Sequence, residues 1–134
     1  MTYVLNLSHV SLQRGDTQIL SDVSWSTRPR QHWVIVGPNG AGKTTLARVA
    51  SGRIAPDTGE VTVSETNLAQ TDPAEVATRV GLASAAVGAK VVPTQSVLDT
   101  VRSAAWGLAV AHDEEYEQVD DERARVLTEI FGVD

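Results

Sequence analysis

Residues 37–46 read Gly37-Pro38-Asn39-Gly40-Ala41-Gly42-Lys43-Thr44-Thr45-Leu46. The segment 37–44 matches the phosphate-loop pattern G-x-x-x-x-G-K-[ST] at every fixed position. It follows an apolar, strand-like run at 33–36 and leads into a helix-like run at 45–50. A helix N-terminus presents unpaired backbone N–H groups and the positive end of the helix dipole, and both attract phosphate. The order of strand, loop and helix therefore predicts a phosphate-binding loop.

The residue types in this loop predict a nucleoside triphosphate with Mg²⁺ as its ligand. Glycines at 37, 40 and 42 let the backbone turn and approach phosphate oxygens without a Cβ in the way. Lys43 is expected to reach the β- and γ-phosphates and to be the catalytic residue, and the Thr44 hydroxyl is expected to ligate Mg²⁺. The expected nucleotide-binding residues of the loop are Gly37, Pro38, Asn39, Gly40, Ala41, Gly42, Lys43, Thr44 and Thr45. The alternative is an ordinary glycine-rich turn before a helix, which would match by chance on the order of once in a few hundred such chains.

Composition and charge exclude several other classes of function. The 134 residues suit one domain, and a hydrophobic content of 42% is enough for a buried core. The absence of cysteine excludes disulfides and thiolate metal sites. Residues 113–134 hold nine acidic residues and two arginines, while the rest is nearly neutral, so we expect no nucleic-acid partner. No apolar run is long enough to cross a bilayer, so a membrane process would need another chain.

Hydrophobic periodicity and turn residues predict alternating strands and helices. Strands or extended segments are expected at 4–12, 19–20, 23–26, 33–36, 60–63 and 79–84, with a turn at 14–16. The run at 33–36 does not alternate, which predicts a strand covered on both faces of a parallel sheet. Helices are expected after the loop, from Pro73 with Asp72 as N-cap, from the capping box of Ser96 and Asp99, and over 114–131. The apolar side of the last helix would hold Val119, Val126, Leu127 and Ile130.

Several short sequences around the loop follow in the order and spacing of a known family. They are Leu20-Ser21-Asp22-Val23-Ser24, Ser51-Gly52, Pro56-Asp57 and Gly59-Glu60-Val61. Together with the unbroken segment 37–46, they resemble the ATP-binding domain of the ABC transporter superfamily. The residues before the loop read as several extended segments, like the antiparallel β-subdomain of ABC ATPases, whereas small nucleotide kinases usually place the loop directly after the first strand. The resemblance covers residues 3–134 and is most specific over 20–63.

The resemblance implies an α/β fold: a P-loop NTPase with an ABC-type ATPase core and an antiparallel β-subdomain. It implies that residues 1–134 are the N-terminal part of one ATP-binding domain, with the β-subdomain starting at 1–30, the P-loop core at 31–92 and the start of the helical region at 93–134. The implied cofactors are ATP and Mg²⁺. The implied partners are a transmembrane permease subunit and a second ATP-binding subunit or the missing C-terminal part. The implied location is cytoplasmic, peripheral to the inner face of the cell membrane.

The chain departs from the family pattern at two positions and in the later motifs. Arg14 stands where the family often has an aromatic residue that stacks on adenine, and because a guanidinium can also stack on a base, Arg14 is an expected nucleotide-binding residue. Ala85 stands at the position of the family's glutamine loop and cannot contact magnesium or water. The sequence has no Leu-Ser-Gly-Gly-Gln signature, no Walker B strand ending in Asp-Glu and no switch histidine after it. We therefore expect an incomplete fold, without the C-terminal strands and signature, that binds ATP but does not hydrolyse it alone.

Three alternatives stay open from the sequence. The first is a soluble ABC-type ATPase of repair or translation, although those usually carry insertions or paired cassettes. The second is a non-catalytic nucleotide-binding regulator. The third is a small-molecule P-loop kinase, which needs an arginine-rich lid; the late arginines Arg123 and Arg125 lie among acidic residues, which disfavours it.

Overall fold

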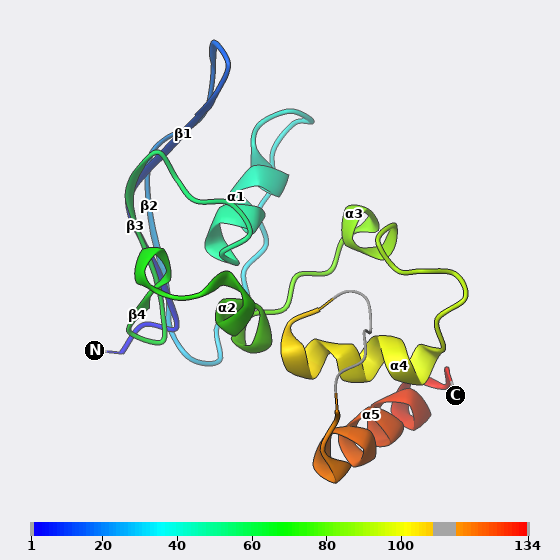
Figure 1. Cartoon of the computed structure of the whole chain (residues 1–134). Helices are drawn as coiled ribbons and strands as arrows, with labels where there is room; N and C mark the ends of the chain where they lie inside the picture. Colours follow the sequence, from blue (N-terminus) through cyan, green and yellow to red (C-terminus); the bar gives the residue numbers. More distant parts are fainter. Residues whose placement is uncertain (1, 109–114, 134) are drawn as a thin grey trace. The chain divides into compact units, whose positions relative to one another are not determined.

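The computed structural model describes residues 2–108 and 115–133 and divides the chain into an N-terminal unit, Met1–Val76, and a C-terminal unit, Ala77–Asp134 (Figure 1). The N-terminal unit contains β1 (Leu5–Arg14), β2 (Thr17–Thr27), α1 (Lys43–Ala50), β3 (Thr58–Val63), β4 (Thr66–Asn67) and the 3₁₀ turn η1 (Leu68–Gln70). The helix α2 (Pro73–Arg79) spans the division, and the C-terminal unit contains α3 (Ala85–Gly88), α4 (Val97–Arg102), the 3₁₀ turn η2 (Ser103–Trp106) and α5 (Gln118–Phe131). The boundaries expected after residues 30 and 92 are not tested by this division and stay a prediction.

A four-stranded antiparallel sheet forms the frame of the N-terminal unit, with strand order β2-β1-β3-β4. Figure 1 shows α1 beside this sheet. The helix contributes Val49 to a core whose other buried members lie on the strands: Leu7, Val10, Leu12, Leu20 and Val61. The expected strands at 4–12 and 60–63 and the turn between β1 and β2 are thus confirmed, and the sheet gives α1 a rigid surface to pack on.

A bulge in β1 explains why its apolar residues change phase along the strand. Leu7 and Val10 are both buried, although one stands at an odd and the other at an even position. His9 lies between them with φ 52°, and Asp22 on β2 has φ 50°, at a point where the pairing of the two strands shifts. The Nδ1 of His9 lies 2.7 Å from Oδ1 of Asp22. The extra residue in β1 returns the later apolar side chains of this strand to the core. On β2, the two extended segments expected on either side of Asp22 form one strand.

The segment 33–36 is not a strand, and the expectation of a strand buried on both faces is wrong. Val34 is 85% exposed and Val36 is 88% exposed. A strand needs a neighbouring backbone to satisfy its N–H and C=O groups, and no strand of the described residues pairs with this segment. Trp33 instead packs edge-on against Trp25 of β2, with ring centroids 5.7 Å apart. This contact holds the segment that leads into the phosphate loop.

Two of the helices begin at the caps that the sequence predicts. Oδ1 of Asp72 accepts a hydrogen bond from the Ala74 N–H at 2.8 Å, and Pro73 is the first residue of α2. Oγ of Ser96 accepts from the Asp99 N–H at 3.0 Å at the start of α4. Both bonds satisfy an N–H group that has no partner within its own helix.

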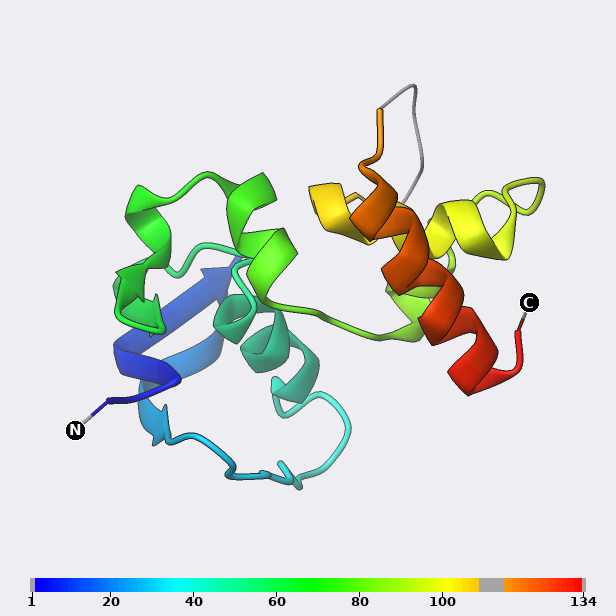
Figure 2. The same cartoon turned by 90° about the horizontal axis from the view of Figure 1, so that it is seen from below.

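The C-terminal unit is built around α4 and α5, which lie side by side (Figure 2). Nη1 of Arg102 lies 2.8 Å from Oδ1 of Asp121 on α5, and Nη2 lies 2.6 Å from Oδ1 of Asp99 on α4. The guanidinium carbon also lies 4.6 Å from the centre of the Tyr116 ring. One arginine therefore connects α4 to α5 through charge, and to the residues just before α5 through a ring contact.

Two expectations for the C-terminal unit are corrected. Residues 80–84 form no strand, again because no described strand pairs with them. On α5, which begins at Gln118, the buried residues are the small Ala124 and Thr128. The larger apolar residues that were expected to share a buried side are between 44% and 70% exposed: Val119, Val126, Leu127 and Ile130. Small side chains let helices approach closely, which explains why they occupy the contact face. Residue 114, expected to begin this helix, lies outside the described residues.

Candidate nucleotide-binding site

The phosphate loop passes directly into α1. Gly42 is the N-cap of the helix with φ 92°, and Gly40 has φ 82°. A Cβ in this left-handed region costs about 1–2 kcal/mol, so both positions favour glycine strongly. Gly37 does not have a positive φ, so the loop requires the conformational freedom of glycine at Gly40 and Gly42. The Leu46 N–H bonds the Gly42 carbonyl at 2.8 Å, and the amides before it in the first turn have no partner within the helix.

The side chain of Lys43 is folded against the start of the loop. Its Nζ donates to the carbonyl oxygens of Gly37 at 2.7 Å and Pro38 at 2.6 Å. An ammonium group has three N–H donors, so one donor remains to meet an anion. Two fixed carbonyls therefore hold a positive charge beside the amides of the first helical turn.

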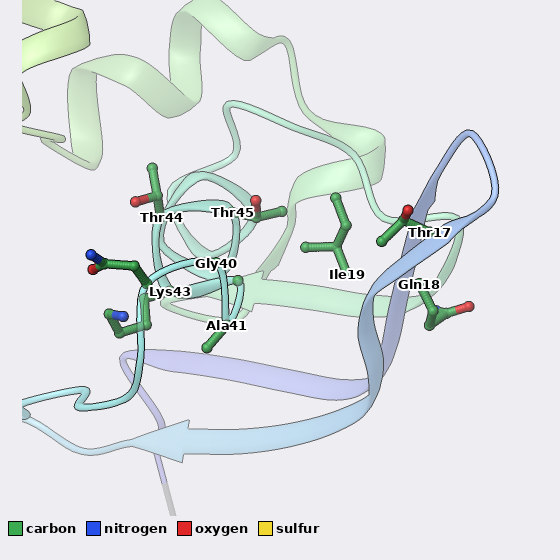
Figure 3. Close-up of a pocket in the computed structure, with 10 residues that line it drawn as sticks. Thr17, Gln18, Ile19, Gly40, Ala41, Lys43, Thr44 and Thr45 are labelled. Atoms are coloured by element: carbon green, nitrogen blue, oxygen red, sulfur yellow. The ribbon is translucent and has the colours of Figure 1, made fainter.

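A cavity of about 560 Å³ lies between this loop, the start of α1 and the start of β2 (Figure 3). Residues from two distant parts of the N-terminal unit line it: Thr17, Gln18, Ile19, Asn39, Gly40, Ala41, Gly42, Lys43, Thr44 and Thr45. The cavity brings the loop's amides, the lysine and three threonine side chains to the wall of one hollow. A hollow of this size and composition suits a polar, anionic ligand.

Most of the loop residues predicted from the sequence line this cavity. Asn39 through Thr45 do so directly, whereas Gly37 and Pro38 reach the site through the carbonyls that hold Lys43. Arg14 does not line the cavity. It is exposed, and its Nη1 donates to the carbonyl of Gln13 at 3.1 Å. The structure thus brings most of the predicted loop residues together at one cavity, and the contact of Arg14 with the base stays a prediction.

The sequence reasoning missed the part of β2 that forms the opposite wall. Thr17, Gln18 and Ile19 come from the strand that follows the hairpin turn, and they were not expected in the site. The signal that could have found them is the turn at 14–16 together with the length of the strands, since these fix which residues of β2 reach the loop. The pairing of the two strands shifts at three places, one of them beside His9, and a periodicity pattern does not locate these shifts.

The residues present fit a triphosphate with Mg²⁺. Gly40 and Gly42 leave the backbone open to phosphate oxygens, and Lys43 supplies a fixed charge. The Thr44 side chain is exposed at the cavity wall, where its hydroxyl is available as a magnesium ligand. Magnesium in such a site neutralises phosphate charge and orients the phosphates.

The position of the family's glutamine loop lies in the C-terminal unit. Ala85 is the first residue of α3, and the cap of that helix is Ser84, whose Oγ accepts from the Val87 N–H at 3.2 Å. Within residues 2–108 and 115–133, no group of three or more His, Asp or Glu side chains could hold a metal ion. In the same ranges, no helix has both the length and the apolar character that crossing a bilayer requires.

Comparison with known proteins places the chain in a family. A family model described as ABC transporter matches residues 20–132. The chain is 36% identical over 104 residues to the uncharacterized ABC transporter ATP-binding protein YlmA of Bacillus subtilis (strain 168), covering 77% of this chain and 39% of the relative. It is 46% identical over 78 residues to the hemin import ATP-binding protein HmuV of Thermobifida fusca (strain YX), covering 58% of this chain and 28% of the relative. The chain thus spans well under half the length of these curated relatives.

Solved structures agree on the fold. The dimeric, post-hydrolysis structure of the ATP-binding cassette MJ0796 bound to ADP and Pi matches with a TM-score of 0.74 at 17% identity, covering 97% of this chain and 58% of that one. The structure of MJ1267, an ATP-binding cassette of an ABC transporter, matches with a TM-score of 0.71 at 21% identity, covering 99% and 55%. The fold class predicted from the sequence, an ABC-type P-loop NTPase present in part, is confirmed. This chain therefore belongs to the ABC transporter family and corresponds to part of its ATP-binding protein.

Proposed function

We propose that this chain is the nucleotide-binding part of an ABC transporter ATP-binding subunit and that it binds MgATP at the phosphate loop. The observation that carries the proposal is the position of Lys43, whose Nζ is held 2.7 Å from the Gly37 carbonyl with one donor left over. This charge lies beside the unpaired amides of the first turn of α1 and on the wall of the 560 Å³ cavity. A fixed cation next to helix N-terminal amides is a site for the phosphates of a nucleotide.

Each part of the loop has a proposed role in binding. The remaining donor of Lys43 meets the β- and γ-phosphates, and the amides of the loop and first turn surround their oxygens. The Thr44 hydroxyl ligates Mg²⁺. Arg14 stacks its guanidinium on adenine from the tip of the β1–β2 hairpin. The phosphate-loop pattern supports the roles of the loop residues, the two carbonyls that hold Lys43 support its role, and the family resemblance supports that of Arg14.

We further propose that this chain alone binds ATP without hydrolysing it. Transfer of a phosphoryl group to water requires a residue that orients the water and groups that stabilise the spreading charge. The sequence supplies Lys43 for the charge but has no Asp-Glu strand, no signature and no switch histidine. In the full assembly, a transmembrane permease and a second ATP-binding subunit act with it at the cytoplasmic face of the membrane. One curated relative is named a hemin import ATP-binding protein, which supports solute transport as the process that ATP binding serves.

The test is a pair of measurements on the 134-residue chain. Isothermal titration with ATP is run in excess Mg²⁺ and then in excess EDTA, and phosphate release is followed in the same samples. The proposal predicts one site per chain, weaker binding when Mg²⁺ is removed, and no release of phosphate above the buffer rate. Failure of ATP to bind would overturn the binding site, and steady phosphate release would overturn the separation of binding from hydrolysis.

A further inference from the structure

The cavity at the loop is lined from two sides. The loop and the first turn of α1 line the side proposed for the phosphates, and the start of β2 lines the other side. Figure 3 shows Ile19 between α1 and Thr17, so these two residues lead from the loop toward the hairpin turn. A nucleotide whose phosphates lie at Lys43 therefore has this strand available for its sugar and base.

Only one of the three β2 side chains offers a polar group to this path. Side chains alternate along a strand, and Figure 3 shows Thr17 and Ile19 on the side of α1, with Gln18 pointing away. The amide Nε2 of Gln18 donates to the carbonyl oxygens of Leu12 and Leu20, so it is already engaged within the hairpin. Ile19 is apolar and partly buried. Within residues 2–108 and 115–133, the Thr17 hydroxyl makes no hydrogen bond.

The pairing of the hairpin places this hydroxyl beside Arg14. Arg14 and Thr17 are cross-strand partners that close the turn, and directly opposed residues project on the same face of a sheet. A base that stacks on Arg14 would have its sugar next to Thr17. The order along the site is then phosphate at the loop, sugar near Thr17 and base at the hairpin tip.

From this arrangement we propose that Thr17 determines sugar specificity, with its hydroxyl making a hydrogen bond to a ribose hydroxyl of the bound nucleotide. The inference rests on the proposed function, since it assumes that the phosphates lie at the loop. A hydroxyl can both donate and accept, which matches the 2′- or 3′-hydroxyl of ribose. Because Thr17 is exposed, the bond is worth about 2- to 10-fold in affinity, the range of an ordinary net hydrogen bond.

The experiment compares four ligands by isothermal titration on the full chain in excess Mg²⁺: ATP, 2′-deoxy-ATP, 3′-deoxy-ATP and inorganic tripolyphosphate. The variants are Thr17→Val, which removes the hydroxyl at nearly the same volume, and Thr17→Ser, which keeps it. Lys43→Ala, titrated with ATP and tripolyphosphate, tests whether binding depends on the loop lysine. Thr94→Val is the matched control, because Thr94 is exposed and lies in the other unit. Circular dichroism checks that every variant keeps the fold of the parent chain.

We expect the parent chain to bind ATP about 2- to 10-fold more tightly than one of the two deoxy nucleotides. Thr17→Val should lose this preference while its affinity for tripolyphosphate is unchanged, and Thr17→Ser and Thr94→Val should keep it. If Thr17→Val discriminates between the sugars as the parent does, while binding still depends on Lys43, the sugar contact is overturned and the proposed function stands. If neither ATP nor tripolyphosphate shows binding that depends on Lys43, the proposed function falls and the sugar contact with it.

Discussion

Gly42 lies so close to Ile19 that a Cβ on the glycine would stand 3.0 Å from the Ile19 carbonyl oxygen. This close approach places the phosphate loop next to β2, and both residues line the cavity. Gly42 also has φ 92°, a conformation that side-chain-bearing residues rarely adopt. The Gly42→Ala variant should therefore lose about 1–2 kcal/mol of unfolding free energy and bind MgATP at least about 10-fold more weakly, because the loop must move away from β2. Urea unfolding and isothermal titration measure the two effects.

Gly81→Ala is the matched control for this prediction. A Cβ at Gly81 meets no atom within 4 Å, and its backbone angle is not in the left-handed region. Its unfolding free energy should change by no more than about 0.5 kcal/mol. An equal loss of MgATP affinity in both variants would show that the Gly42–Ile19 contact has no special role.

Arg102 should hold α4 and α5 together. Its guanidinium contacts Asp121 and the Tyr116 ring, and partly exposed contacts of these kinds add up to about 1 kcal/mol. Arg102→Ala should lower the unfolding free energy of the chain by about this amount, whereas Arg102→Lys should recover only part of it because the planar fork is lost. Arg123→Ala, on the exposed part of α5, is the control. Thermal unfolding that is unchanged in Arg102→Ala would contradict this role.

The contribution of Asp99 to stability should depend on pH in the acid range. The Ser96 hydroxyl, more than Arg102, holds the pKa of Asp99 below its ordinary value, while desolvation opposes the shift. A lowered pKa in the folded state means that the contribution is complete above the unfolded-state pKa of about 3.9 and is lost as the pH falls through the folded-state pKa. The stability difference between the parent and Asp99→Asn should therefore shrink below about pH 4. A difference that stays constant from neutral pH to strong acid would contradict the assignment.

The loop and the helix caps could be predicted from the sequence because their physics is local. The spacing of Gly40, Gly42 and Lys43 fixes a loop before a helix, and Asp72 and Ser96 each bond an amide two or three residues away. Such features need no knowledge of distant parts of the chain.

Features that depend on distant pairing could not be predicted in the same way. The apolar run at 33–36 has strand composition, yet a strand forms only beside a partner, and none of the described strands pairs with it. The place of Thr17 and Ile19 at the site depends on the hairpin register, which includes a residue of positive φ at His9. A left-handed histidine in a strand leaves no clear pattern in the sequence, although the change in phase between Leu7 and Val10 does reflect it.

The most direct test of the nucleotide site compares the two lysines of the chain, Lys43 and Lys90, in titrations with MgATP. Lys43→Ala removes the charge that Gly37 and Pro38 hold in place, and Lys90→Ala removes an equal charge from an exposed position in the other unit. Loss of a charge-assisted hydrogen bond should weaken binding by about 10- to 150-fold in Lys43→Ala, with Lys90→Ala close to the parent. Equal affinity of Lys43→Ala and the parent chain would contradict the assignment of residues 37–44 as the nucleotide site.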